Sequence, residues 1–141
     1  MTQENKELLI KDLCARLPYG VMAKFGDSNP TKITNITQCI YSNSWFVESE
    51  GEYDGEYDGM SCQINNVKPY LFPLSSMTEE QCYELSSICS GFQDCWKYIK
   101  TPIPLSICYF EQIEWFHKNH FDYRGLIEKG LAIDATDKNI Y

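Results

Sequence analysis

The chain has 141 residues, of which 43% are hydrophobic and 14% aromatic, a composition that suits one folded domain and is too apolar for a disordered chain. Its net charge of -8, from 20 acidic and 12 basic residues, disfavours binding to nucleic acid or to an anionic membrane and suits a basic protein partner. No stretch approaches the roughly 18 apolar residues of a membrane span, and the N-terminus lacks the apolar core of a secretory signal. We therefore expect a single compact domain over residues 1–141, located in the cytoplasm.

The first predicted element is a helix from Glu4 to Arg16. Leu9, Leu13 and Leu17 recur every four residues and so form one apolar stripe. Pro18 disfavours helical geometry at the residue before it, so the helix is expected to end there.

Stretches rich in β-branched and aromatic residues predict the strands of a small antiparallel sheet. They are Val21 to Phe25, Lys32 to Tyr41, Trp45 to Glu48, Ser61 to Ile64 and Tyr70 to Phe72. Pro69 and Pro73 bracket the last of them and favour a position at the edge of the sheet.

Helical patterns dominate the second half of the chain. Ser76 with Glu79, and Thr78 with Gln81, both have the spacing of a capping box. The predicted helices are Thr78 to Cys89, Phe92 to Ile99, Leu105 to His120 and Tyr123 to Lys129, and the predicted core includes Leu13, Leu85, Ile113 and Phe116. The order of helix, strands and then helices predicts an α+β fold, with a small, curved, antiparallel sheet and helices packed on one face.

Seven cysteines are spread along the chain, and none forms a Cys-x-x-Cys pair. An odd count without an export signal predicts reduced thiols. Cys82, Cys89 and Cys108 fall on apolar helical faces and are interpreted as small core residues.

The most unusual pattern is a row of acidic residues at every second position. The row comprises Glu48, Glu50, Glu52, Asp54, Glu56 and Asp58. On one extended strand the carboxylates would share a face at a spacing of about 6.6 Å, which resembles the spacing of nucleic-acid phosphates. The alternative is a solvated hairpin or loop insertion over residues 48–60, because Gly51, Gly55 and Gly59 favour turns.

Two metal hypotheses lack their full ligand sets. Asp54, Glu56 and Asp58 follow the first positions of a calcium loop, but Asn65 stands where the bidentate Glu belongs. His117 and His120 have helical spacing that suits zinc, without a second ligand motif. We therefore predict no cofactor.

The segment around Tyr123 has two interpretations. Asp122 and Arg124 flank this tyrosine as an exposed recognition tip, or they belong to a helix junction in which Asp122 is the N-cap. The local capping pattern favours the junction.

Three segments, Leu8 to Val21, Lys68 to Gln81 (KPYLFPLSSMTEEQ) and His120 to Ile127 (HFDYRGLI), resemble an uncharacterised family of small proteins from gut-bacterial phages and prophages. The resemblance implies a gene that acts inside a bacterial host, and it implies no active site.

These observations predict a non-enzymatic interaction protein, and in a sharper version an acidic inhibitor of a host nucleic-acid-binding or defence protein. The partner is expected to be a host or phage protein with a basic surface, with no direct contact to nucleic acid or membrane. The candidate partner-binding residues are Glu48, Glu50, Glu52, Tyr53, Asp54, Glu56, Tyr57 and Asp58. The alternative is a small metal- or cysteine-dependent enzyme, and the oligomeric state stays open.

Overall fold

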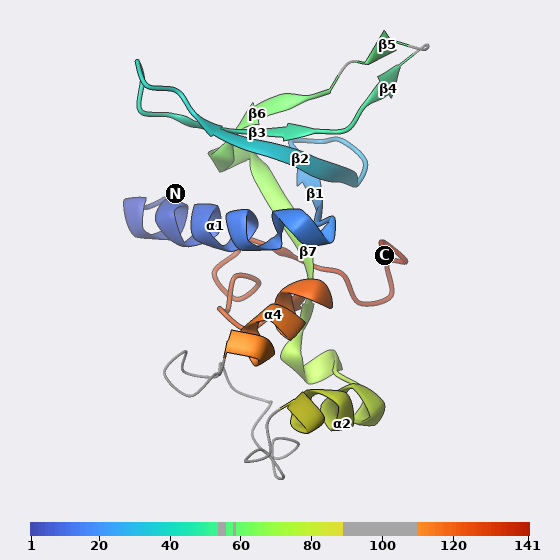
Figure 1. The fold of residues 1–141 in the computed structure, drawn as a ribbon. Coiled ribbons are helices and arrows are strands. Elements are labelled where there is room, and N and C mark those ends of the chain that lie inside the picture. Colours follow the sequence, from blue (N-terminus) through green and yellow to red (C-terminus); the bar gives the residue numbers. More distant parts are fainter. Residues whose placement is uncertain (54–55, 58, 89–109) are drawn as a thin grey trace. The chain divides into compact units, whose positions relative to one another are not determined.

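A computed structural model describes residues 1–53, 56–57, 59–88 and 110–141 (Figure 1). The chain divides into two compact units, the first comprising residues 1–70 with 140–141 and the second residues 71–139. The described elements are three helices and a mostly antiparallel, open sheet, which confirms the α+β class. That the chain folds as one domain stays a prediction.

The first unit is built on antiparallel strands in the order β6-β3-β2-β1-β7. Their bounds are β1 Met22–Phe25, β2 Thr31–Gln38, β3 Trp45–Ser49, β6 Ser61–Gln63 and β7 Val67–Pro73, and β7 continues into the second unit. A separate two-stranded pair, β4 Glu52–Tyr53 and β5 Glu56–Tyr57, lies in the connection between β3 and β6.

Helix α1, Gln3–Arg16, has the bounds that the leucine spacing predicts to within one residue. The Thr2 hydroxyl accepts a hydrogen bond from the Asn5 backbone N–H at 3.2 Å, which satisfies one of the free donors at the helix start. After α1 a single 3-10 turn carries Pro18, and Gly20 follows with a φ of +71°, a conformation that glycine adopts without strain.

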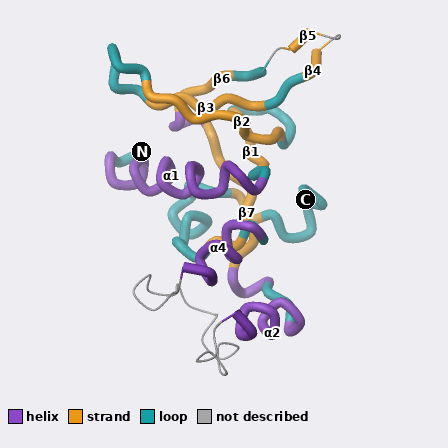
Figure 2. Tube along the Cα trace, viewed as in Figure 1, coloured by secondary structure: helices purple, strands orange, loops and turns teal. Residues whose placement is uncertain are grey.

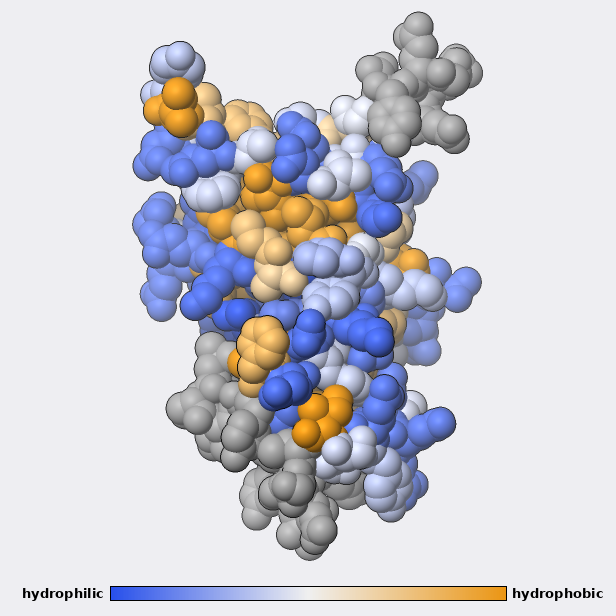
Figure 3. Space-filling view, in the orientation of Figure 1, coloured by the Kyte–Doolittle hydropathy of each residue, from blue (hydrophilic) through white to orange (hydrophobic). Residues whose placement is uncertain are grey.

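The core of the first unit lies between α1 and one face of the sheet (Figure 1). Helix α1 contributes Leu9 and Leu13, and the rest of the unit contributes Val21, Ala23, Phe25, Ile33, Val47, Ile64 and Val67. In Figure 3 the hydrophobic side chains of this unit gather between α1 and the strands. Full burial of one such leucine stabilises the fold by about 1.5–3 kcal/mol relative to exposure.

In the part of the second unit that the structure describes, the end of β7 is followed by two helices, labelled in Figure 2, and two short strands. They are α2 Glu79–Ile88, α4 Phe110–Lys118, β8 Phe121–Asp122 and β9 Ile133–Asp134. Its core comprises Leu74, Met77, Cys82, Leu85, Trp115, Phe116, Phe121 and Tyr123. In this cluster the Trp115 and Phe121 rings stack with centroids 5.5 Å apart, and the Phe116 and Tyr123 rings stack at 5.3 Å.

The edge position predicted for the strand from Tyr70 to Phe72 is wrong, because this half of β7 has a neighbouring strand on each side. Gly26 N–H donates to Asn66 O, so every second residue from Asn66 directs its backbone N–H and C=O toward β1. Pro69 is not one of these residues, so its lack of an N–H removes no hydrogen bond to β1. Further along, Ala135 N–H donates to Leu71 O and Phe72 N–H donates to His120 O. The backbone groups of neighbouring residues in a strand point to opposite sides, so this half of β7 has a strand on each side. Its pairing with β8 is parallel.

Two other predictions were wrong in the C-terminal region. Helix α4 ends at Lys118, and His120 lies beyond it with a φ of +60°. The segment from Tyr123 to Lys129 forms a series of turns and no helix, although Gly130 has the φ of +70° that suits a chain reversal. The predicted helix from Phe92 to Ile99 and the start of the one from Leu105 lie outside the described residues.

Candidate functional site

The acidic segment begins on β3, where the structure positions its first two carboxylates. Glu48 lies opposite Asn35 of β2, and the Asn35 Nδ2 donates a hydrogen bond to Glu48 Oε2 at 3.2 Å. Glu50 follows the strand and faces Lys32, with 3.5 Å between Nζ and Oε1 and both side chains about half exposed. An exposed pair of this kind contributes at most about 1 kcal/mol, so Lys32 compensates the charge of Glu50 only weakly.

The base of the acidic segment is closed by backbone contacts. Ser49 N–H donates to Met60 O at 2.9 Å, which joins the end of β3 to the start of β6. A Cβ on Gly59 would lie 2.6 Å from the Ser49 carbonyl oxygen, closer than real Cβ contacts allow. Residue 59 is therefore a glycine for a steric reason, and the segment from Glu50 to Gly59 leaves and re-enters the sheet at one fixed place.

Within this segment the chain reverses direction. Glu52 pairs with Tyr57 and Tyr53 pairs with Glu56 in the antiparallel ladder of β4 and β5. A single row of carboxylates requires one continuous strand, so that interpretation is wrong and the hairpin alternative is correct. The remaining two candidate residues, Asp54 and Asp58, lie outside the described residues. We call residues 48–59 the acidic hairpin.

The two histidines of the zinc hypothesis lie in the second unit. His117 Nε2 and the Tyr123 hydroxyl are 2.7 Å apart and both residues are buried. The described part of the chain contains no group of three or more His, Cys, Asp or Glu residues placed to hold a metal. Of the residues of the calcium hypothesis, Asp54 and Asp58 lie outside the described residues, Glu56 lies on β5 and Asn65 lies in the 3-10 turn before β7.

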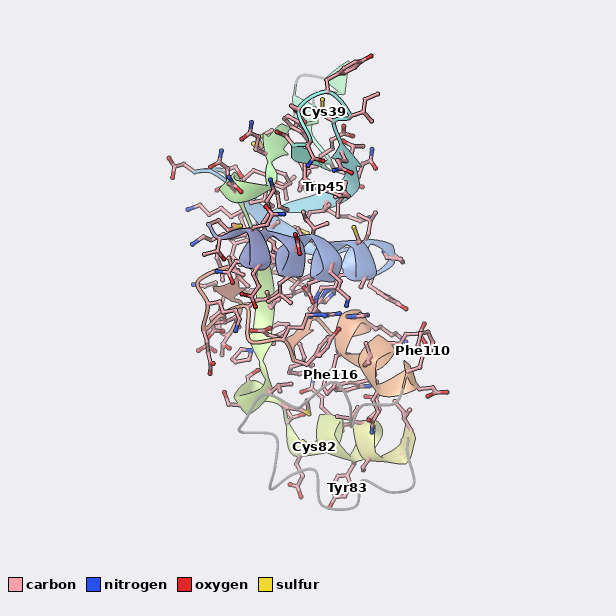
Figure 4. The ribbon with its side chains drawn as sticks, turned by 90° about the vertical axis from the view of Figure 1, so that its left-hand side faces the viewer. Cys39, Trp45, Cys82, Tyr83, Phe110 and Phe116 are labelled. Atoms are coloured by element: carbon pink, nitrogen blue, oxygen red, sulfur yellow. The ribbon has the colours of Figure 1, made fainter. Side chains whose placement is uncertain are left out.

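Of the three cysteines interpreted as core residues, the structure describes only Cys82. Cys82 is buried in the second unit and, in Figure 4, points from α2 toward α4, whereas Cys89 and Cys108 lie outside the described residues. Hydrogen bonds from the side chain and backbone of Ser42 and from the Tyr41 backbone lower the pKa of the Cys39 thiol. None of these groups is a general base of the kind that cysteine catalysis uses.

The segment around Tyr123 is structural. Asp122 is buried and its two carboxylate oxygens accept hydrogen bonds from Leu126 N–H at 2.9 Å and Ile127 N–H at 2.8 Å. Tyr123 is buried as well, and the Arg124 guanidinium lies 4.9 Å from the centre of its ring. The exposed recognition tip is therefore wrong. Asp122 does cap the following turn, with bonds to residues four and five positions ahead.

One exposed feature was missed by sequence reasoning. The turn between β2 and β3 carries Ile40 and Tyr41, which are 85% and 94% exposed. The sequence does contain a sign of it, because two large apolar residues stand beside Ser42, Asn43 and Ser44 in a segment otherwise typical of a turn.

Comparison with family models, with curated proteins and with solved structures finds no match. No helix among the described residues is long and apolar enough to cross a membrane. The resemblance to phage and prophage proteins thus stays a hypothesis.

Proposed function

We propose that this chain is a non-enzymatic interaction protein of a phage or prophage that acts in the cytoplasm of a bacterial host. Its partner is a host or phage protein with a basic surface. In the sharper form of the proposal the chain inhibits a nucleic-acid-binding or defence protein by occupying its basic groove.

The observation that carries the proposal is the acidic hairpin. Residues 48–59 contain six carboxylates and no basic residue. The fixed base at Ser49 and Met60 presents the segment on the sheet of the first unit. Charges placed in this way attract a basic partner over a distance and speed association.

Compact placement of the charge also supports inhibition of a basic groove. Because Glu52 and Glu56 lie on paired antiparallel strands, their backbone positions are closer together than they would be on a single strand. A groove that binds nucleic acid favours concentrated negative charge.

The test is affinity capture from cells of the encoding organism, with tagged chain as bait and mass spectrometry of the retained proteins. The bait is compared with a hairpin variant that carries Glu50→Gln, Glu52→Gln, Asp54→Asn, Glu56→Gln and Asp58→Asn. A control variant carries five changes at exposed acids elsewhere, namely Glu7→Gln, Asp27→Asn, Glu84→Gln, Glu128→Gln and Asp137→Asn.

Both variants change the net charge equally, so they separate position from total charge. The proposal predicts a basic protein that the wild type and the control variant retain and the hairpin variant loses. Equal retention by all three baits, or no retained protein at all, would contradict it.

A further inference from the structure

The turn that joins β2 and β3, residues 39–44, is held in one conformation by its own hydrogen bonds. Cys39 N–H donates to Ser44 O at 2.8 Å, and the Gln38 side chain bonds to the side chain of Asn43. Asn43 adopts a φ of +52°, which asparagine tolerates better than most residues. Figure 4 shows Cys39 at this end of the sheet, with Trp45 at the start of β3.

This turn presents apolar surface that the described fold does not use. Ile40 is 85% exposed and Tyr41 94% exposed, the two highest values among the large hydrophobic residues of the described chain. Single exposed apolar residues are normal on protein surfaces. Two adjacent ones on an ordered turn are a more specific feature, because a rigid apolar tip loses little entropy when it binds.

We propose that Ile40 and Tyr41 form an anchor that enters an apolar pocket, edged by basic residues, on a protein partner. The inference rests on the proposed function in that it takes the partner to be a protein and the acidic hairpin to contact the same molecule. Tyrosine is among the residues that most often dominate the binding energy of such interfaces.

The position of the tip relative to the acidic hairpin supports a shared partner. The tip precedes β3 and the acidic hairpin begins at the other end of that strand, so they project from opposite ends of it (Figure 1). From Ser44 to Glu50 the chain advances six residues, which is about 20 Å in extended conformation. A protein interface of standard size, about 800 Å² on each side, spans that distance.

The sheet surface between the tip and the hairpin is also open to a partner. Val47 and its cross-strand neighbours face the core, so the alternate residues of β3 face outward. On that outer face Thr37 is exposed, and Phe46 and Glu48 are partly exposed. This surface continues the anchor toward the acidic hairpin.

The distribution of charge favours a protein partner for this tip over a lipid surface or a second copy of the chain. Residues 39–44 carry no charge, so their burial exposes no ion to an apolar pocket. The six acidic residues of the acidic hairpin repel an anionic lipid surface, and they repel the same segment of a second copy. A basic rim around the pocket is the arrangement that these neighbouring carboxylates favour.

The first experiment places the photo-crosslinker p-benzoylphenylalanine at position 41 or, as control, at position 83. Tyr83 is 69% exposed on α2, so the control site is accessible and lies in the other unit. Both proteins are irradiated in cells of the encoding organism, and the crosslinked peptides are sequenced by mass spectrometry.

The inference predicts a crosslink at position 41 to one protein, at a peptide of apolar residues flanked by Lys or Arg, and no such product from position 83. A crosslink to a second copy of the chain, a crosslink to lipid or the absence of any product would overturn it.

In the second experiment, the partner identified by the crosslink is purified and titrated with the Tyr41→Ser variant and with the Tyr83→Ser variant of the chain. The Tyr41→Ser variant should weaken binding about 30-fold, the size of a hot-spot contact, and should leave the salt dependence unchanged because no charge is removed. Equal affinities for the two variants would overturn the anchor. A lost salt dependence in the hairpin variant tests the proposed function separately.

Discussion

At the scale of single residues, Gly59 stands out among the described glycines because an added side chain there would meet backbone. An added methyl group would lie 2.6 Å from the Ser49 carbonyl oxygen, which belongs to the backbone and yields only if β3 or the hairpin base moves. We expect Gly59→Ala to reduce the free energy of unfolding by about 1–3 kcal/mol, the usual cost of forcing a group into occupied space. Urea unfolding of the purified protein measures this difference.

The neighbouring Met60 provides the control for this substitution. Met60 is 37% exposed and contributes its backbone oxygen to the hairpin base, so Met60→Ala should change stability little. If Gly59→Ala proves no less stable than Met60→Ala, the close approach of the two chains is wrong.

The side chain of Tyr141 is hydrogen-bonded to the sheet of the first unit. Its hydroxyl donates to Tyr70 O at 2.7 Å and accepts from Met22 N–H at 3.2 Å. Burial of the hydroxyl raises the pKa of Tyr141 to about 12, and the hydrogen bond from Met22 opposes this shift. The folded state therefore holds the proton more tightly than the unfolded chain does.

The pH dependence has a definite sign. Both states are protonated below the ordinary tyrosine pKa of about 10, so the contribution of the Tyr141 hydroxyl is fully present there. Between about pH 10 and pH 12 the unfolded state loses its proton first, and the contribution falls. Wild type should thus exceed Tyr141→Phe in stability by about 1 kcal/mol at neutral pH, for the lost hydrogen bonds. A difference that stays constant up to pH 12 in parallel urea titrations would contradict the account.

At the scale of elements, local sequence patterns predicted the described helices and strands where the residues involved act within one turn or one strand. The capping box of Thr78 and Gln81 is formed as expected, with Thr78 N–H donating to Gln81 Oε1 at 2.9 Å and Gln81 N–H donating to Thr78 Oγ1 at 3.2 Å. Ser76, the competing candidate, lies in a 3-10 turn and donates its hydroxyl to Pro73 O.

The misses at this scale have several causes, which are pairing partners far along the chain, a buried carboxylate and a buried ion pair. The second half of β7 is enclosed because residues near 120 and 135 return to it. A buried carboxylate at Asp122 fixes the turn after β8 and replaces the predicted helix. Asp12 and Arg16 are buried on α1 at the same helical spacing as the leucines, and their 2.7 Å ion pair makes that burial possible.

The predicted core residues are confirmed in α1, α2 and α4, with Ile113 only partly buried. Phe116 and Phe110 lie on the same helix and provide a matched test. Phe116 is 1% exposed inside the second unit, whereas Phe110 is 75% exposed (Figure 4). We expect Phe116→Ala to lower the free energy of unfolding by about 3–5 kcal/mol and Phe110→Ala to leave it nearly unchanged. If thermal melts show a similar loss of stability for both variants, this placement of α4 is wrong.

At the scale of the whole molecule, the sequence predicted the charge of the candidate site and left its shape open between a single strand and a hairpin. Net charge and the alternating acidic residues are properties of composition and spacing, so no structure is needed to find them. Whether Glu52 and Glu56 share one strand or pair across a turn depends on backbone pairing, which glycine-rich sequence leaves open. The exposed tip at Ile40 and Tyr41 escaped for the same reason, since its exposure depends on where β2 and β3 end.

The central claim is that the acidic hairpin binds a basic protein partner, and affinity measured against salt tests it most directly. The partner identified by capture is titrated by calorimetry with wild type, with the five-residue hairpin variant and with the matched control variant, at low and at high salt. The account predicts that wild type and control bind alike and weaken steeply as salt rises, because salt screens the attraction between exposed charges. The hairpin variant should bind weakly at low salt and change little thereafter, while its melting temperature stays that of the wild type. Equal affinity and equal salt dependence in all three proteins would contradict the claim.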